Sequence, residues 1–200
     1  MDLITKRIYD EKATFFDGDF KPKPGEMENL PLISQFMRLL PGNQVLDIGA
    51  GPGHQAQYMS RFGLNVVCAD FSFQMAKICK GKKLEAVVMD IERLAFRSQS
   101  FDGIYAQAVI LHIRRPSVSA VIQGLIGLLK PQGVLGLAVM EGDSEGYKDY
   151  PGTTGRKRWF TYFTHQEIKE YIGDKCSLEF EDVLRREGKP NFLYYVFRKK

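Results

Sequence analysis

The sequence predicts an α/β fold in which helices cover both faces of a mostly parallel sheet. Two observations carry this prediction. Short apolar runs alternate with helical patterns along most of the 200 residues, which is the arrangement of successive βαβ units. The run from 134 to 140 contains no charged residue, as expected of a central parallel strand that is buried on both faces.

Five strands and four helices are expected in the first 140 residues. A helix near 29–40 carries an apolar stripe and stops at Pro41-Gly42, and a longer helix begins near Pro116 and is ended by Pro131 and Gly133. The expected strands cover residues 44–48, 65–69, 86–89, 101–106 and 134–140, and the other helices cover about 53–62 and 72–80.

The last quarter of the chain predicts one helix and two strands. Thr164 and Glu167 have the spacing of a capping box, so a helix starts there, and it should end at Gly173. Strands at 177–185 and 192–198 are joined by the turn 187–191, which is too short for a crossover helix. These two strands should therefore be antiparallel neighbours. We assign no element to the polar, glycine-rich stretch 141–157.

Size and composition predict one soluble domain spanning residues 1–200. Hydrophobic residues make up 44% and charged residues 26%, which argues against a disordered or fibrous chain. No signal peptide or membrane span is recognised, so we expect a cytoplasmic protein. Cys68, Cys79 and Cys176 stand at unrelated spacings, which predicts reduced thiols and neither disulfides nor a metal site.

The net charge of +4 comes partly from basic runs at 77–83, 155–158 and 198–200. Such runs are more often solvated surface than a nucleic-acid footprint. We expect a small-molecule partner and no membrane partner, in a monomer or homodimer, and the composition favours this over a nucleic-acid partner.

Polar groups and glycines follow the predicted strands, where ligands bind in open α/β sheets. Gly49-Ala50-Gly51-Pro-Gly53 follows the first strand and lets the backbone approach a ligand closely. Asp70 follows the second strand and suits the two hydroxyls of a ribose. Asp90 follows the third, with the apolar Ile91 beside it, and suits an adenine. Gln107 follows the fourth. Each signal alone is as often a turn or a helix cap, but the order indicates an adenosine-containing ligand.

The segment Val45-Leu-Asp-Ile-Gly-Ala-Gly-Pro-Gly53 resembles the first motif of the class I S-adenosylmethionine-dependent methyltransferases. Cys68-Ala-Asp70-Phe-Ser72, Asp90-Ile-Glu, Ser100-Phe-Asp-Gly-Ile-Tyr105 and Leu128-Leu-Lys-Pro-Gln-Gly133 are similar to later parts of that family's pattern, so the likeness covers roughly residues 40–140. Within the family, the chain looks most like the small single-domain enzymes of ubiquinone-biosynthesis or tellurite-resistance type.

The resemblance implies a seven-stranded, doubly wound sheet of order 3-2-1-4-5-7-6 whose last strand is antiparallel. It also implies S-adenosylmethionine as cofactor, S-adenosylhomocysteine as product, and no metal. The residues implied to contact the cofactor are Asp47, Gly49, Ala50 and Gly51 at its methionine end, Asp70 and Phe71 near the ribose, Asp90 and Ile91 at the adenine, and Gln107 near the methionine.

A dinucleotide-binding dehydrogenase is the main competing interpretation, and its pattern fits poorly. His54 stands where the third glycine of the dinucleotide loop belongs, and Asp47 is an acid that dehydrogenases seldom carry in their first strand. Tyr171 and Lys175 have the spacing of a short-chain dehydrogenase pair, but Gly173 should break the helix between them.

Methyl transfer from a sulfonium is a direct displacement, so the protein mainly aligns the reactants and excludes water. His112 is the best-placed candidate for a catalytic base, and a packing role is its alternative. His54 and His165 stand at helix starts and are expected to act locally. The residues after the fourth strand lack the motifs of enzymes that methylate DNA bases.

We expect residues 1–27 to form an N-terminal cap and residues 141–163 a lid over the pocket, since insertions beyond strand ends often do so. Tyr9, Arg158 and Tyr162 are the candidate substrate-binding residues, and Arg156 and Lys157 share the basic turn with Arg158. Aromatic side chains that can enclose a substrate or serve as packing anchors are Tyr9, Phe15, Phe16, Tyr147, Tyr150, Trp159, Phe160 and Tyr162.

A methyltransferase acting on a small-molecule acceptor is the leading hypothesis. The alternatives are an RNA-modifying methyltransferase and a non-catalytic, cofactor-binding partner subunit.

Overall fold

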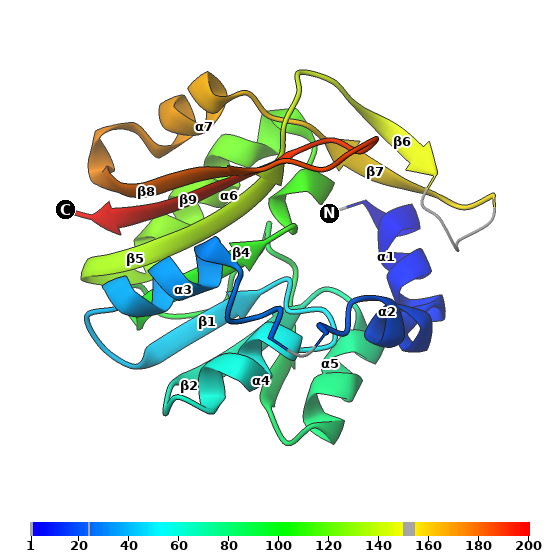
Figure 1. Ribbon diagram of the computed structural model, residues 1–200, viewed down its shortest axis with the longest axis horizontal. Coiled ribbons are helices and arrows are strands. Elements are labelled where there is room, and N and C mark those ends of the chain that lie inside the picture. Colours follow the sequence, from blue (N-terminus) through cyan, green and yellow to red (C-terminus); the bar gives the residue numbers. More distant parts are fainter. Residues whose placement is uncertain (1, 24, 150–154) are drawn as a thin grey trace.

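The computed structural model describes residues 2–23, 25–149 and 155–200, and its core is one seven-stranded sheet (Figure 1). The strands of this sheet are β1 (Gln44–Ile48), β2 (Asn65–Asp70), β3 (Glu85–Val88), β4 (Phe101–Gln107), β5 (Leu129–Met140), β8 (Cys176–Leu184) and β9 (Phe192–Lys199). Their order is β3-β2-β1-β4-β5-β9-β8. Strand β9 is antiparallel to β5 and to β8, and the other pairs are parallel. The predicted order, with an antiparallel last strand, is therefore confirmed.

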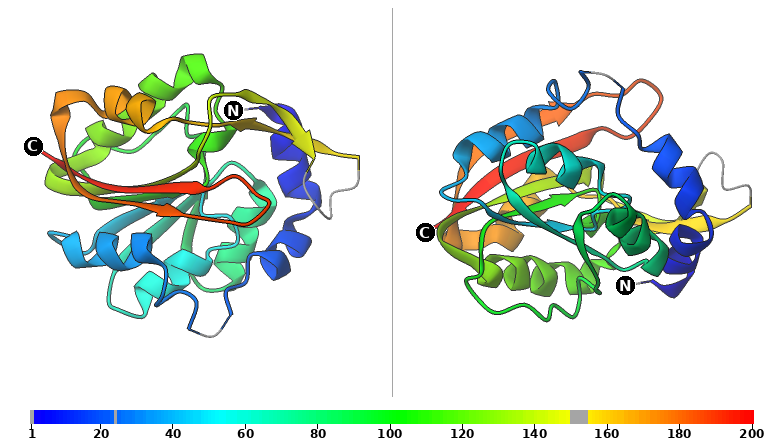
Figure 2. Two further views of the ribbon diagram at one scale, coloured as in Figure 1. Left: turned by 45° about the horizontal axis from the view of Figure 1, so that its top comes forward. Right: turned by 90° about the horizontal axis from the view of Figure 1, so that it is seen from below.

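Helices cover both faces of the sheet, as predicted (Figure 2). One face packs against α3 (Pro31–Leu39), α4 (His54–Ser60) and α5 (Phe73–Gly81), and the other packs against α6 (Arg115–Leu128) and α7 (His165–Ile172). Helix α6 buries Val118, Ile122 and Leu125 on one stripe, because residues at helical spacing share a face. Two short 3₁₀ turns, η1 (Ile110–His112) and η2 (Gly173–Lys175), complete the helical elements of the main layers.

Helix α6 and strand β5 meet earlier than the sequence predicts. The helix ends at Leu128, and Pro131 and Gly133 lie inside β5 instead of in a turn between the two elements. The pairing with β4 is irregular here, since Phe101 faces Leu129 and Gly103 faces Val134. Gln132 has a φ of 64°, so the strand accommodates the residues of the expected turn as a bulge.

The expected cap and lid contain regular elements that the sequence did not predict. The N-terminal cap forms α1 (Leu3–Glu11) and α2 (Ala13–Asp19), and the lid forms an antiparallel hairpin of β6 (Glu145–Asp149) and β7 (Lys157–Thr161). Strand β6 is almost entirely exposed. Its residues do not alternate between apolar and polar, so the sequence alone does not predict a strand that pairs with β7. Tyr150 lies outside the described residues.

The local predictions for α7 are confirmed. Thr164 and Glu167 form the capping box, and Gly173 ends the helix with a φ of 60°. Tyr171 and Lys175 therefore do not share one helix. This agrees with the sequence argument that the two residues do not form a short-chain dehydrogenase pair. The three cysteines are buried free thiols. In the part of the chain that the structure describes, no helix has the length and apolar character needed to cross a membrane.

Candidate functional site

The loop after β1 turns sharply on left-handed glycines. Gly49, Gly51 and Gly53 have φ values of 71°, 53° and 78°, a region that side-chain-bearing residues rarely adopt. The amide of Gly49 donates to the Ala69 carbonyl oxygen at 2.7 Å, which ties the loop to the end of β2. A Cβ on Gly49 would lie 2.4 Å from the Cβ of Val109, so only glycine fits there.

Asp70 fixes this loop from the end of β2. One carboxylate oxygen accepts the Gly51 amide at 2.8 Å, and the other accepts the Ser72 amide at 2.8 Å. Asp70 therefore accepts from backbone amides as a capping residue does, which is the alternative role that the sequence suggests for it. Burial raises the pKa of Asp70 to about 6, because removal from water disfavours the charged form.

Asp47 lies beneath the same loop and is almost fully buried. Its Oδ2 has no hydrogen-bond partner among the described residues. Burial, and then the charge of Asp70, raise the pKa of Asp47 to about 7. Two carboxyl groups therefore share one poorly hydrated region, which favours a cationic ligand group there.

A pocket of about 520 Å³ is lined by residues at the carboxyl ends of the parallel strands and by residues of the N-terminal segment. Figure 1 shows that these strand ends face α1 and α2. This volume is typical of small-molecule sites, which span roughly 300–1,000 Å³. The loop end of the pocket, as we name it, is lined by most of the predicted cofactor residues, namely Asp47, Gly49, Ala50, Gly51, Asp70, Phe71, Ile91 and Gln107.

Two of the predicted cofactor residues, Asp90 and Gln107, form hydrogen bonds within the protein. Asp90 stands between Met89 and Ile91, which line the pocket, and its Oδ1 accepts the Glu92 amide at 2.9 Å. The Oε1 of Gln107 accepts the Tyr105 hydroxyl at 2.6 Å, which leaves the amide nitrogen as the donor end of this side chain.

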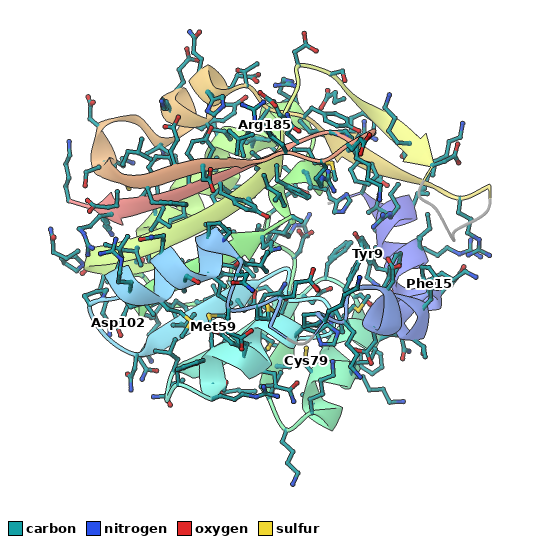
Figure 3. All side chains as sticks on the ribbon, in the orientation of Figure 1. Tyr9, Phe15, Met59, Cys79, Asp102 and Arg185 are labelled. Atoms are coloured by element: carbon teal, nitrogen blue, oxygen red, sulfur yellow. The ribbon has the colours of Figure 1, made fainter. Side chains whose placement is uncertain are left out.

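The opposite end of the pocket, which we name the cap end, is lined by Tyr9, His112, Arg158 and Phe160. Tyr9 projects from α1 toward the centre of the molecule (Figure 3), and its hydroxyl lies 2.9 Å from Nε2 of His112. Nδ1 of His112 lies 2.6 Å from the Trp159 carbonyl oxygen. Because a carbonyl only accepts, Nδ1 carries the proton and Nε2 accepts from Tyr9.

Arg158 completes this group from β7. The guanidinium donates to the Tyr9 hydroxyl and is almost fully buried. Burial, and then the charge of Arg158, lower the pKa of His112 to about 3. Burial raises the pKa of Tyr9. At neutral pH the cap end thus holds a neutral imidazole, a neutral phenol and one cation.

Helix α1 connects the two ends of the pocket. Asp10 accepts hydrogen bonds from the Ser72 hydroxyl at 2.7 Å and from the Gln74 amide at 3.3 Å, both at the start of α5. On its other side, the Thr5 hydroxyl accepts the Trp159 amide at 2.9 Å. These contacts join α1 to both α5 and β7 and hold Tyr9 in place.

A second set of contacts fastens α2. Lys82 donates to the Asp17 carboxylate at 2.7 Å and to the Pro52 carbonyl at 2.8 Å. His54 lies 3.0 Å from the Asp17 carbonyl oxygen. The histidine at the start of α4 therefore joins the cap to the glycine loop, a longer-range contact than the sequence indicated.

Some predicted residues do not reach the pocket. Tyr162 packs against the main core cluster, and its carbonyl accepts from Arg115. Arg156 pairs with Glu11 and does not line the pocket, and Lys157 is exposed. His165 lies at the start of α7 and contacts the Tyr195 hydroxyl at 2.7 Å.

The sequence missed a further wall of the pocket, which comes from two distant segments. These residues are Met27 and Leu30, before α3, and Leu184, Arg186, Phe192 and Tyr194, in and beside β8 and β9. Apart from Arg186, these are apolar or aromatic residues whose pattern is the same as that of core residues, so no local signal separates them. The folding of the C-terminal strands beside β5 brings Leu184, Arg186, Phe192 and Tyr194 to the site.

Residues 46–137 match the family model described as a methyltransferase domain. The matched segment is thus similar to the methyltransferase domain family. The resemblance inferred from the sequence, which covers roughly residues 40–140, is therefore confirmed.

The relatives of the methyltransferase domain act on different acceptors. An ubiquinone biosynthesis O-methyltransferase of Xanthomonas campestris pv. campestris is 32% identical over 108 residues, or 50% of this chain and 44% of that protein. A tRNA (carboxymethyluridine(34)-5-O)-methyltransferase of Arabidopsis thaliana is 27% identical over 173 residues, or 84% of this chain and 38% of that protein. The chain thus spans about half the length, or less, of these curated relatives.

The fold is shared with solved methyltransferase structures. The 1,6-didemethyltoxoflavin-N1-methyltransferase of Burkholderia thailandensis, crystallised with 1,6-didemethyltoxoflavin and S-adenosylhomocysteine, superposes with a TM-score of 0.69 at 18% identity. The match covers 97% of this chain and 88% of that chain. At this level of identity the likeness shows the fold alone.

The loop end of the methyltransferase domain fits a ligand that carries an ammonium group and a ribose. Oδ2 of Asp47 is a buried acceptor that an ammonium can satisfy. A Cβ on Gly51 would meet no atom within 4 Å, so open space lies beside this part of the loop. In the described part of the chain, no group of three or more His, Cys, Asp or Glu residues is arranged to hold a metal ion.

Proposed function

We propose that this chain transfers a methyl group from S-adenosylmethionine to a small-molecule acceptor. The observation that carries the proposal is a single pocket that joins the loop end, with Asp47, Gly51 and Asp70, to the cap end, with Tyr9 and His112. A donor held at the loop end would face an acceptor held at the cap end. When bound, S-adenosylmethionine supplies an electrophilic methyl group on a sulfonium.

Each residue at the loop end has a distinct task in this proposal. Asp47 would bind the methionine ammonium, and the amide of Gln107 would donate to the methionine carboxylate. Asp70 keeps both carboxylate oxygens within reach of the ribose hydroxyls while it holds the loop, because each oxygen accepts more than one hydrogen bond. Asp90 and Ile91 would border the adenine.

His112 would accept the proton of a hydroxyl acceptor through Tyr9, whose hydroxyl donates to Nε2. Its tautomer is set by the Trp159 carbonyl, so Nε2 presents a lone pair toward Tyr9 and the pocket. The depressed pKa of His112 makes it a weak base toward an unreacted alcohol. An acceptor oxygen that has gained a methyl group is a far stronger acid, and a weak base is sufficient at that stage.

The N-terminal cap would exclude water from the reacting groups. Helix α1 contacts both α5 and β7, so it closes the pocket over the position between donor and acceptor. Exclusion of water and fixed orientation are the main contributions that a protein makes to a direct displacement.

Ligand-induced thermal stabilisation tests the proposal. We expect S-adenosylhomocysteine at about 100 times its Kd to raise the Tm by roughly 5–10 °C, whereas NADH leaves it unchanged, because only a ligand of the native state stabilises it. The same protein, incubated with labelled S-adenosylmethionine and a library of small metabolites, should transfer label to at least one of them. No Tm shift with either the methionine or the homocysteine form would reject the proposal.

RNA is the second candidate acceptor, because a relative that matches 84% of this chain is named as a tRNA methyltransferase. Salt-sensitive retention of the protein on tRNA, together with label transfer to tRNA, would favour it. Cofactor binding without label transfer to any acceptor would instead favour the third candidate, a non-catalytic partner subunit.

A further inference from the structure

Charged residues of both signs line the pocket, and besides the acids of the loop end and the buried arginine of the cap end they include Lys6, Asp19, Lys21, Lys23, Glu26 and Arg186. Asp47 and Asp70 lie at the loop end, and Arg158 lies at the cap end. Tyr9 contacts Arg158, and Asp10, the next residue of α1, accepts from the Ser72 hydroxyl near Asp70. Charges buried in a confined site act strongly on what binds there, because little water screens them.

Arg158 is held at the cap end by aromatic rings. Its guanidinium carbon lies 4.9 Å from the ring centre of Tyr9, 5.1 Å from that of Phe16 and 5.2 Å from that of Phe160. Only 2% of the residue is exposed. Cation–π contacts of this kind fix the plane of a guanidinium, and its five N–H donors match the geometry of an anionic oxygen group.

The pocket that Arg158 lines also contains His112 and several aromatic side chains. Nε2 of His112 is occupied by the Tyr9 hydroxyl, so the imidazole does not present a competing acceptor directly to Arg158. Phe160, Phe192 and Tyr194 supply an aromatic and apolar wall in the same pocket. A planar acid would bury its ring against this wall and place its charge at the guanidinium.

We infer that the methyl acceptor is a small organic acid, and that Arg158 is the specificity-determining residue that binds its anionic oxygen. This inference rests on the proposed function. An acceptor with a negative charge would be attracted both by the guanidinium of Arg158 and by the positive charge of a donor held at the loop end. A cationic amine at the same place would be repelled by Arg158.

Matched pairs of aromatic probes test the inference on the full chain saturated with S-adenosylhomocysteine. The acids are benzoate and 4-hydroxybenzoate, their neutral partners are benzamide and 4-hydroxybenzamide, and benzylamine serves as the cation. Binding is measured by ligand-observed NMR and calorimetry. We expect each acid to bind at least about tenfold more tightly than its amide, which is the scale of a charged hydrogen bond, and benzylamine to bind least.

Substitutions at Arg158 should remove this preference. We expect Arg158→Met to bring the acid and amide affinities within about twofold, and Arg158→Lys to retain part of the difference, because an ammonium keeps the charge but loses the fork of donors. The matched control is Arg156→Met, which removes the same charge two residues away and outside the pocket. It should leave the preference unchanged.

The inference would be overturned if no acid binds the wild-type protein more tightly than its neutral partner. An acid preference that persists in Arg158→Met would also overturn it. The comparison of acid and amide affinities in the wild-type protein tests the inference even if Arg158→Met fails to fold. If the wild-type protein does not bind S-adenosylhomocysteine, the proposed function has failed; normal cofactor binding without acid preference rejects only the role of Arg158.

Discussion

The loop end and the cap end of the pocket are adjacent in space, but they are assembled in different ways. At the loop end, the glycines after β1 and the carboxylate after β2 stand within 30 residues of chain and are set by backbone geometry. At the cap end, Tyr9 meets His112 across 103 residues and Arg158 across 149. The loop end is therefore a local device on a rigid sheet, whereas the cap end exists only when α1, η1 and β7 pack together.

This difference implies that a substitution at one end of the pocket can impair binding there without impairing binding at the other end. The loop end should respond to changes in backbone conformation and charge, and these should appear in cofactor binding. The cap end should respond to side-chain changes that alter acceptor binding while cofactor affinity is kept.

The largest effect is expected from Gly49→Ala. The new Cβ would lie 2.4 Å from Val109 and the residue would keep a φ of 71°, so we expect a loss of about 2–4 kcal/mol in the free energy of unfolding. Urea unfolding measures this loss. Gly63→Ala is the control, because its φ is 80° and a Cβ would meet no atom within 4 Å; it should cost only about 1–2 kcal/mol. Equal losses in the two variants would contradict the steric argument.

The next largest effect is expected from Asp70→Ala. Loss of the carboxylate should weaken binding of S-adenosylhomocysteine by about 10- to 100-fold, the scale of charged hydrogen bonds to two hydroxyls. Calorimetry measures the change. At the cap end, His112→Asn should alter cofactor affinity by less than about twofold. If Asp70→Ala also changes the affinity by less than about twofold, Asp70 serves only to hold the glycine loop.

The smallest effect is a pH dependence that belongs to the loop end. Burial raises the pKa of Asp47 to about 7, so the empty protein binds this proton more tightly than the unfolded chain does. The contribution of Asp47 to stability is therefore present at low pH and is lost as pH rises from about 4 to 7.

An ammonium ligand reverses that preference, since it favours the charged carboxylate. Affinity for S-adenosylhomocysteine should rise about tenfold from pH 6 to pH 8, and calorimetry in buffers of different ionisation enthalpy should detect proton release. Asp47→Asn should flatten the profile. Asp102→Asn, which changes a buried acid outside the pocket, should leave it unchanged. A flat wild-type profile would mean that Asp47 does not bind the ammonium.

The sheet and the loop end follow from local signals in the sequence. Apolar alternation placed the strands, and the glycines with Asp70 marked the ligand edge, because turns that need left-handed backbone and carboxylates at strand ends leave local signals. Errors appeared where tertiary contacts override local preference, as at Pro131 and Gly133, whose expected turn is absorbed into β5.

The cap end, in contrast, depends on long-range packing. The sequence named Tyr9, His112 and Arg158 singly, but nothing in their spacing predicts that one hydroxyl joins the other two side chains. It also proposed Tyr162, which packs into the core. The physical reason is that long-range side-chain contacts depend on how cap, hairpin and sheet dock, and docking is driven by apolar burial that looks alike at every core position.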